Sequence, residues 1–329
     1  MQNKKGLYIL ITLGLVVLVL SVIGTGIGAV YIPPYEIISN LLGNDIGSNQ
    51  LIIQNYRLPR IVIALLVGAG LSVSGAVLQG IIRNPLASPD VIGITKGAGL
   101  SAAIVIILFP KAPIFVLPVA AFLGAACIAI LLYLLAYKNG VKPSTLSLVG
   151  IALGAICHAG IQYLMVKFPL EVNAALVWLT GSLWGKSWDD VWLLLPWILI
   201  LLPVTIIMAV KLDILNLGDD VAEGLGERVE VMRMVLLFIA VGLAGSSVAI
   251  VGSLGFVGLI APHIARRLVG NKHHLLLPVS ALLGMVLVLI ADMLARGLMP
   301  PVEIPAGIFT AVIGAPYFLY LLRKMQSTP

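Results

Sequence analysis

Charged residues are scarce in this sequence. Aspartate, glutamate, lysine and arginine make up 10% of its 329 residues, and apolar residues make up 60%, whereas an ordinary soluble domain has about 25% charged and about 45–50% apolar residues. The mean hydropathy is +1.11. A chain of this composition has too little polar surface to cover a globule in water. The composition therefore argues against a soluble enzyme or a nucleic-acid-binding protein and indicates a membrane protein.

Cysteine is almost absent, and the common catalytic motifs are missing. Cys127 and Cys157 lie in apolar stretches and form no CxxC or Cys/His cluster, so the sequence predicts neither a zinc site nor a disulfide framework. It contains no HExxH and no GxSxG motif, and the phosphate-loop-like run 181–187 has the wrong spacing. We therefore predict no catalytic residue, no metal site and no cofactor on this chain, so another chain must supply any energy for transport.

Long apolar runs predict ten membrane-spanning helices within a single permease domain, residues 1–329. About 20 apolar residues are needed to cross about 30 Å of hydrocarbon at 1.5 Å rise per residue. The first run is too long for the apolar region of a signal peptide, so we interpret it as a retained span. The predicted spans are approximately 7–29, 60–82, 91–109, 113–136, 145–166, 190–210, 232–251, 255–269, 275–296 and 304–322.

The cations give this arrangement an orientation. If the amino terminus is cytoplasmic, ten crossings make the carboxyl terminus cytoplasmic too, and 14 of the 20 lysines and arginines then lie inside. This asymmetry agrees with the positive-inside rule. Ten spans divide into two five-helix halves, and because five is odd, any repeat between them must be inverted across the membrane. Glycine and proline interrupt the apolar runs 75–93 and 245–270, which indicates non-helical backbone at membrane depth. Such backbone is tolerated only where protein or a water-filled cavity supports it, so both breaks point to a central pathway.

Residues 212–230 form a polar segment that this topology places in the cytoplasm, between the sixth and seventh spans. The segment is predicted to form two short helices about a glycine turn, with acidic residues where a membrane protein usually has basic ones. Two interpretations stay open. It is either a solvated linker or an amphipathic knob, seated in a groove on a cytoplasmic partner, whose apolar side consists of Leu217, Val221, Ala222 and Leu225.

Three arginines on the predicted outer side are exceptions to the charge rule. Arg57 and Arg60 open the second span and Arg296 ends the ninth. They either extend to the membrane interface or dock an external partner that bears carboxylates, because the planar guanidinium group suits paired hydrogen bonds to a carboxylate. Asp292 precedes Arg296 by one helical turn and is predicted to pair with it.

His158 and Gln162 lie four residues apart on one face of the fifth span. Such residues either form hydrogen bonds between helices or line a passage. Two functional classes stay open on these residues. The chain is either a permease driven by a partner or, as an alternative, a stand-alone secondary carrier in which Asp292 and His158 bind the coupling ion.

Several spaced passages resemble the FecCD family, the permease subunits of bacterial ABC importers for iron-siderophores, haem and cobalamin. The resemblance runs from about residue 50 to residue 323. The passages that carry it are Arg57-Leu-Pro-Arg60, Gly75-Ala-Val-Leu-Gln79, Asn84-Pro-Leu-Ala87-Ser-Pro89, Ile92-Gly93-Ile-Thr-Lys-Gly97-Ala98, Leu217-Gly-Asp-Asp-Val-Ala-Glu-Gly-Leu-Gly226, Gly255-Phe-Val-Gly-Leu-Ile-Ala-Pro262-His263-Ile-Ala-Arg266, Glu303-Ile-Pro305-Ala-Gly307 and Gly314-Ala-Pro316. Lys96 departs from the family pattern and has no assigned role.

The resemblance implies an all-α, BtuC-like permease of a type II ABC importer in the bacterial cytoplasmic membrane. Its implied partners are a second permease, identical or homologous, two ATPase subunits that bind ATP and magnesium, and an extracytoplasmic binding protein. The expected substrate is an iron(III)-siderophore, with haem or cobalamin as the alternative.

The resemblance also implies site residues. Arg57, Arg60 and Arg296 look like the positions that meet glutamates of the binding protein. The passage is expected along spans five and ten, which places His158 and Gln162 near it and adds Gln79 and Asn84. The loop received by the ATPase is expected to consist of Leu217, Gly218, Asp219, Asp220, Ala222, Glu223, Gly224, Leu225 and Gly226.

Overall fold

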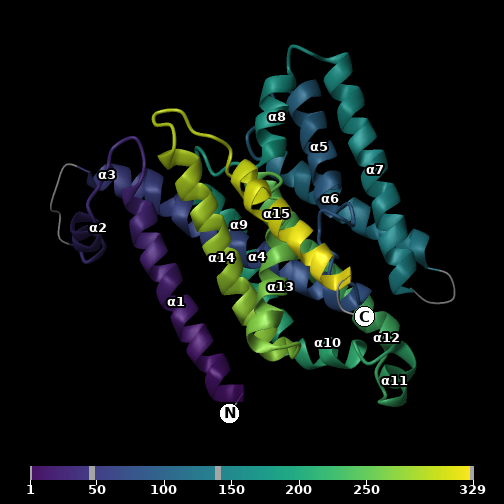
Figure 1. Cartoon of the computed structure of the whole chain (residues 1–329). Helices are drawn as coiled ribbons and strands as arrows, with labels where there is room; N and C mark the ends of the chain where they lie inside the picture. The colour runs from purple at the N-terminus through teal and green to yellow at the C-terminus, as the bar shows by residue number, and fades with distance from the viewer. Residues whose placement is uncertain (1, 44–48, 138–141, 327–329) are drawn as a thin grey trace.

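The computed structural model describes residues 2–43, 49–137 and 142–326, and its regular elements are helices (Figure 1). Ten helices correspond one to one to the predicted spans, with ends that differ by a few residues. They are α1 (Gln2–Gly26), α4 (Leu58–Ile82), α5 (Ile94–Leu108), α6 (Val116–Ala136), α7 (Pro143–Lys167), α9 (Trp188–Ile207), α12 (Val229–Val251), α13 (Val257–Val269), α14 (His273–Gly297) and α15 (Ala306–Gln326).

These ten helices differ in length. Among the described residues, seven helices are long and apolar enough to cross a membrane, and α5 and α15 provide shorter apolar stretches. Helix α13 has 13 residues, about 20 Å at 1.5 Å per residue, so it covers part of the membrane thickness. The prediction of ten helices in an all-α membrane fold is confirmed, with the difference that α5 and α13 begin after the glycine- and proline-rich breaks.

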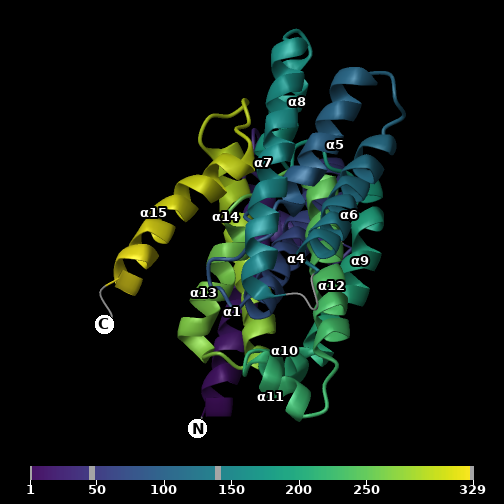
Figure 2. The same cartoon turned by 90° about the vertical axis from the view of Figure 1, so that its right-hand side faces the viewer.

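Six short elements lie at the two ends of the bundle. Helices α2 (Pro34–Leu41), α3 (Gln50–Ile52) and α8 (Val172–Thr180), with the π-helical segment η1 (Ile53–Arg57), lie at the end that we call the α8 end. Helices α10 (Ala209–Leu215) and α11 (Asp219–Gly224) lie at the opposite end together with the N-terminus, and we call this the α11 end (Figures 1 and 2).

Helices α4 and α12 form the centre of the bundle, and 83% of the apolar window of each is buried. They run in opposite directions, and each is followed by a break and a short helix, α5 or α13. They are the second helices of the first and second sets of five, so their placement fits the predicted inversion. Gly75 of α4 meets α13 so closely that a Cβ atom there would lie 1.8 Å from the carbonyl oxygen of Gly258.

The break between α4 and α5 and the break between α12 and α13 meet inside the bundle. Asp90, in the first break, accepts hydrogen bonds from the side chains of Thr95 and Ser253 and from the backbone N–H of Phe256, and the last two residues belong to the second break. Gly252 has φ +77 and lies so near the carbonyl oxygen of Trp178 that a side chain would not fit, which is a position that requires glycine. Specific hydrogen bonds and a required glycine therefore hold the two breaks in place at the centre of the bundle.

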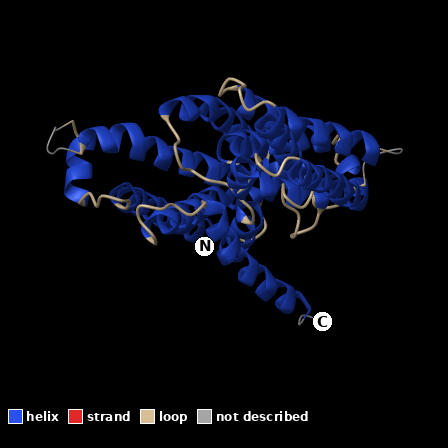
Figure 3. Cartoon of the chain, turned by 90° about the horizontal axis from the view of Figure 1, so that it is seen from above, coloured by secondary structure: helices blue, strands red, loops and turns tan. Residues whose placement is uncertain are grey.

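Helices α7 and α15 border the bundle, and α15 leans away from the other helices towards its C-terminal end (Figures 2 and 3). Large apolar side chains on both helices are exposed, including Ile156 and Val166 on α7 and Val312 and Leu319 on α15. A membrane protein exposes such residues to lipid or to another subunit.

Candidate functional site

Five charged residues form a cluster at the α8 end, which we call the arginine cluster: Arg57, Arg60, Arg296, Asp292 and Glu303. Arg60 donates from Nε to Asp292 Oδ1 at 2.8 Å and from Nη1 to both carboxylate oxygens of Glu303 at 3.0 and 2.8 Å. Asp292 Oδ2 also lies 3.1 Å from Arg296 Nη2. A single buried carboxylate thus holds two guanidinium groups from two helices.

The other partners of the arginine cluster are backbone carbonyls in the last turn of α1 and just after it. Arg57 donates from Nη1 to the carbonyl oxygens of Thr25 and Gly26 at 2.6 and 2.9 Å. Arg296 donates to the carbonyl oxygens of Gly24 and Ile27 at 2.6 and 2.9 Å. The last four carbonyls of a helix have no partner within it, so these arginines satisfy the end of α1 and fix it against α4 and α14.

Arg57, Arg60 and Arg296 are buried in this conformation. Their exposed fractions are 7%, 8% and 4%, because the segment after α1 and the loop that carries Glu303 cover them. The predicted pairing of Asp292 with Arg296 is confirmed. Docking of a partner on these arginines stays a prediction, and it now requires that the partner reach a covered cluster.

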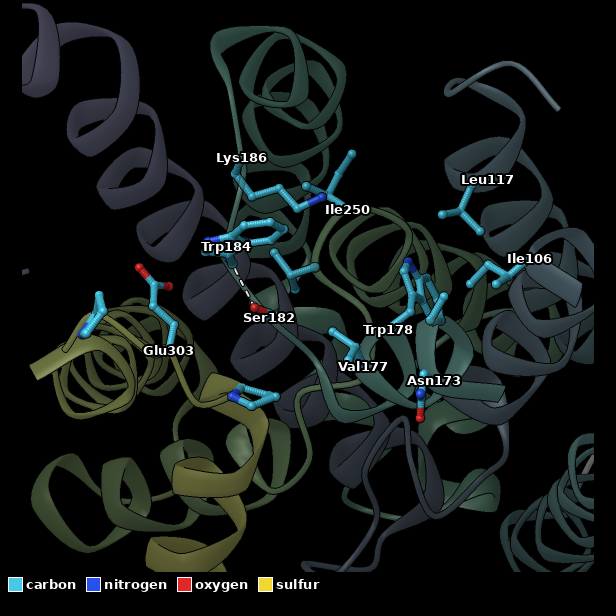
Figure 4. A pocket seen from close by; sticks show the side chains of 14 residues that line it. Ile106, Leu117, Asn173, Val177, Trp178, Ser182, Trp184, Lys186, Ile250 and Glu303 are labelled. Carbon is cyan, nitrogen blue, oxygen red and sulfur yellow. Dashed lines mark hydrogen bonds between the residues drawn. The ribbon is translucent and has the colours of Figure 1, made fainter. Parts of the chain in front are cut away.

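A cavity of about 750 Å³ opens beside the arginine cluster, between α8, the segment 182–186 and the loop 301–305 (Figure 4). Glu303 lies at one side of it, Trp178 lies at the other, and Trp184 and Lys186 lie between them (Figure 4). Its walls are mostly apolar, with a few polar groups at the rim, which is the usual composition of a binding site. Glu303 therefore contacts the buried Arg60 and also lines the open cavity.

At the α11 end, Asp219 is the central acid. Its Oδ1 lies 2.8 Å from Arg233 Nη2 of α12 and also pairs with Arg83, the residue that ends α4. Arg83 further donates to the carbonyl oxygen of Leu215 from Nε at 3.0 Å and from Nη2 at 2.7 Å. Helices α10 and α11 are thus tied to both central helices at one point.

Helix α10 is also tied to α14. Asp213 Oδ1 lies 2.6 Å from His273 Nδ1 and accepts a hydrogen bond from the backbone N–H of His273 at 3.1 Å. Lys211 pairs with Glu227 across the short helices. The α10–α11 segment is therefore held by charged contacts to three long helices, so it is not a free linker.

The α10–α11 segment has the predicted form of two short helices, with Gly218 at φ +114 between them and Gly226 at φ +83 after them. Leu217, Val221 and Leu225 are 60%, 50% and 61% exposed. Val221 and Leu225 are one helical turn apart and Leu217 lies just before α11. We call these three exposed apolar side chains the ridge, and Asp220, Glu223, Gly224 and Gly226 beside it are exposed as well.

Two residues expected to contact the ATPase, Ala222 and Asp219, make their contacts within this chain instead. Ala222 is 0% exposed and packs in the core, because it lies on the opposite side of the short helix from the ridge, so its assignment to a partner contact is wrong. The carboxylate of Asp219 is paired with Arg83 and Arg233. The surface left for a partner consists of the ridge and the exposed acids and glycines beside it.

Gln79 and Asn84 differ in exposure. Gln79 is 2% exposed, accepts a hydrogen bond on Oε1 from Arg266 Nη1 at 2.6 Å and contributes to the wall of a cavity at the α11 end, so its place on a passage stays a prediction. It links α4 to α13. Asn84 is exposed, accepts a hydrogen bond from the backbone N–H of Leu86 at 2.9 Å, and lines a cavity of about 260 Å³ at the α11 end.

His158 and Gln162 are exposed on α7, and Gln162 Nε2 lies 3.2 Å from His158 Nε2. A hydrogen bond at this position requires the His158 tautomer whose proton is on Nδ1. Lys96, which had no assigned role, is exposed beside the same helix. His158 and Gln162 are thus accessible, as residues on a passage must be, and their role in transport stays a prediction.

Comparison with known proteins identifies the family. Residues 15–324 match the model of the FecCD transport family. The chain belongs to the FecCD transport family. Relatives include the Fe(3+)-citrate import system permease protein YfmE of Bacillus subtilis, 62% identical over 98% of this chain and 96% of that protein.

Other relatives in the family carry different names. The iron(3+)-hydroxamate import permease FhuG of Bacillus subtilis is 43% identical over 98% of both chains, and the Fe(3+) dicitrate permease FecD of Escherichia coli is 45% identical over 84% of this chain and 86% of that one. A solved metal-chelate type ABC transporter in an inward-facing conformation matches with a TM-score of 0.84 and 33% identity, over 97% of this chain and 99% of that one.

Membership in this family makes the chain a multi-pass membrane protein and a transport subunit, not an enzyme. The alternative of a secondary carrier driven by Asp292 loses its support, because that carboxylate is 0% exposed and pairs with Arg60 and Arg296. Sequence reasoning missed the roles of Glu303, Arg83, Arg233 and Arg266. Arg233 meets Asp219 across 14 residues, and the partners of the other three lie 136 to 243 residues away, so none of these contacts is a local helical spacing that the sequence pattern could reveal.

Proposed function

We propose that this FecCD permease carries iron(III)-citrate or a closely similar iron(III)-hydroxycarboxylate chelate into the cytoplasm. The observation that carries the choice of chelate is the 62% identity to an Fe(3+)-citrate permease over nearly the whole of both chains, against 43% to a hydroxamate permease. Transport proceeds by alternating access: the passage opens first to the outside and then to the cytoplasm, and partner ATPase subunits that bind ATP and magnesium drive the change.

The α11 end is assigned to the cytoplasm in this proposal. The N-terminus lies there (Figure 1). Lys4 and Lys5 are in the first residues of α1, Arg228 lies between α11 and α12, and Lys272 immediately precedes α14, next to the His273 that contacts α10. Cations concentrate on the cytoplasmic side of bacterial membrane proteins. The α8 end, with the arginine cluster and the 750 Å³ cavity, then faces the extracytoplasmic binding protein.

The apolar ridge of Leu217, Val221 and Leu225 is proposed as the contact with the ATPase. An apolar ridge on a short helix fits a hydrophobic groove on a partner, and this one is exposed at the proposed cytoplasmic end. Because Asp219 ties α11 to Arg83, the residue after α4, and to Arg233 of α12, a movement of the ridge is passed to the two helices that lead into the breaks.

Glu303 is proposed as the point where the binding protein acts on the arginine cluster. Its side chain is 28% exposed, whereas that of Asp292 is 0% exposed, so Glu303 is the accessible carboxylate on Arg60. A glutamate of the binding protein can therefore compete with Glu303 without displacing Asp292. That exchange would release the loop 301–305 at the edge of the cavity.

A second permease, identical or homologous, is proposed to cover the exposed face of α7. Because His158 and Gln162 are polar groups on this otherwise apolar face, a passage between two subunits would keep them in water. The proposed assembly is two permeases, two ATPases and one binding protein.

Reconstitution tests the proposed function. The permease, its ATPase and the binding protein are placed in vesicles, and uptake of radioactive iron(III)-citrate is measured with and without ATP. Uptake that needs ATP and the binding protein is expected. Uptake by the permease alone down an ion gradient, or uptake of a ferric hydroxamate in place of the citrate chelate, would contradict the proposal.

The ridge is tested by replacing Leu217 and Leu225 together with asparagine. We expect ATPase copurification to fall at least tenfold, because two exposed apolar contacts of about 1 kcal/mol or more each are lost. Leu170→Asn is the matched control, since Leu170 is 91% exposed at the opposite end. Normal copurification of the ridge variant would remove the ridge from the interface.

A further inference from the structure

Lys96 places a cation at the middle of the membrane-spanning region. It lies in the first turn of α5, and its side chain runs along α7 at Gly154, where a Cβ atom would lie 3.3 Å from Lys96 Cδ and 3.7 Å from Nζ. Gly154 is near the midpoint of the 25-residue helix α7. The ammonium group is therefore about as far from either end of the helix as it can be.

Among the described residues, no hydrogen bond or ion pair joins Lys96 to an acceptor. Asp90 is near enough to interact electrostatically, but its carboxylate accepts hydrogen bonds from Thr95, Ser253 and the backbone of Phe256. That carboxylate is already used to hold the two breaks together. Lys96 thus interacts with Asp90 only at a distance, and its ammonium group stays exposed.

An exposed cation at this depth cannot face hydrocarbon without a large cost, so its surface must face water or a polar partner. Asp90 connects this place to the second break, and Phe256 of that break packs against α15 at Gly314. Lys96 therefore lies on the side of the bundle that α7 and α15 border.

Two further polar groups continue from Lys96 along α7. His158 is four residues after Gly154, and Gln162 is four residues after His158. The position where Lys96 packs and these two side chains therefore lie on one face of α7. Both side chains are exposed. The large residues around them are apolar, and Ile151, Ile156 and Val166 are 53%, 67% and 83% exposed. One cation, one imidazole and one amide thus form a polar line across an apolar wall.

We propose that Lys96, His158 and Gln162 form a binding site on the passage for the carboxylates of an anionic iron(III) chelate. This inference rests on the proposed function and assigns it a substrate contact within the membrane. An iron(III)-citrate chelate suits the site because the ionised carboxylates of citrate outweigh the ferric charge. An ammonium group attracts them, and the imidazole and amide can donate hydrogen bonds to their oxygens.

The first test is uptake of iron(III)-citrate by vesicles that contain the whole importer. Lys96→Gln is expected to lower the initial rate about tenfold and to leave ATPase stimulation by the binding protein unchanged, because docking and coupling lie elsewhere. Lys96→Arg keeps the charge and should retain most of the uptake. Lys111→Gln, at an exposed lysine in the loop before α6, is the control. Wild-type uptake by Lys96→Gln would overturn the proposal.

The second test does not depend on transport. In a chain without its two cysteines, Cys127 and Cys157, Lys96→Cys is treated with a charged, water-soluble thiol reagent in the assembled importer. Labelling is expected, and iron(III)-citrate delivered by the binding protein should slow it. Leu153→Cys, buried on α7 at the same depth, should not react. An unreactive Lys96→Cys would show a lipid-facing or structural lysine and overturn the site.

The two tests separate this inference from the proposed function. If wild-type vesicles take up no iron(III)-citrate, the proposed substrate is wrong, whatever Lys96 does. If they take it up and Lys96→Cys is neither labelled nor protected, the substrate stands and the site is wrong. Loss of assembly in Lys96→Gln, together with an unreactive Lys96→Cys, would likewise assign Lys96 a structural role.

Discussion

Both ends of the bundle join arginines to carboxylates, but in different surroundings. In the arginine cluster, the side chains of Asp292 and Arg296 are 0% and 3% exposed. At the α11 end, the side chains of Asp219 and Arg83 are 36% and 29% exposed. The same chemical pair is therefore buried at one end and about one-third exposed at the other.

The difference in burial predicts a difference in role. Removing one partner of a buried pair leaves an uncompensated charge in a medium that cannot solvate it, whereas exposed pairs exchange with water at little cost. The arginine cluster thus anchors α1, α4 and α14 to one another. The Asp219 link can open and close, as an element that passes on movement requires.

Asp292→Asn is expected to have the largest effect. It leaves Arg60 and Arg296 without their shared charge, and loss of one partner from a buried pair costs about 3–5 kcal/mol. A strongly lowered thermal midpoint, measured by size-exclusion chromatography of detergent-solubilised protein, is expected. Asp189→Asn, at an exposed acid in the first turn of α9, is the control. An unchanged midpoint would mean that the cluster is not an anchor.

Asp219→Asn is expected to affect transport more than stability. The pair with Arg83 is partly exposed and contributes about 0.2–1 kcal/mol, whereas Arg233 is 3% exposed and loses a buried partner, so the thermal midpoint should fall, but by less than in Asp292→Asn. Iron uptake should fall about tenfold, because α11 loses its tie to both central helices, while ATPase copurification persists. The neighbouring exposed acid gives the matched variant Asp220→Asn. If the two variants transport equally well, Asp219 does not pass on movement.

Glu303→Gln is expected to have the smallest effect. Arg60 keeps its bond to Asp292, so stability should change by no more than about 1 kcal/mol. Because the competing carboxylate is gone, the binding protein should dock about threefold more tightly, a change of about 0.6 kcal/mol. Surface-immobilised binding protein measures the affinity, with Glu171→Gln as the control. Weaker docking of Glu303→Gln would show that Glu303 is a contact and not a competitor.

Much of the fold could be predicted from local patterns. Apolar runs of span length gave helices within a few residues of α4, α6, α7 and α12, because hydropathy and length are properties of one segment. The glycine turn in 212–230 and the pairing of Asp292 with Arg296 were also local, since four residues are one helical turn.

Burial of the polar side chains was not predictable in the same way. Gln79 is buried against Arg266, 187 residues later, and its local sequence does not predict that contact. Ala222 was expected on the ridge and lies in the core. In a membrane bundle, helix surfaces that face lipid are as apolar as those that face protein, so the sequence pattern does not distinguish the buried face.

The sequence by itself therefore determined the membrane class, the ten helices and the polar segment between α9 and α12, because each depends on composition over about 20 neighbouring residues. The tertiary structure decided which charges are covered. Arg60 meets Asp292 across 232 residues and Glu303 across 243, and such contacts arise when helices distant in the chain pack together. That packing also leaves the ammonium group of Lys96 exposed, whereas the guanidinium groups of Arg57, Arg60 and Arg296 are buried.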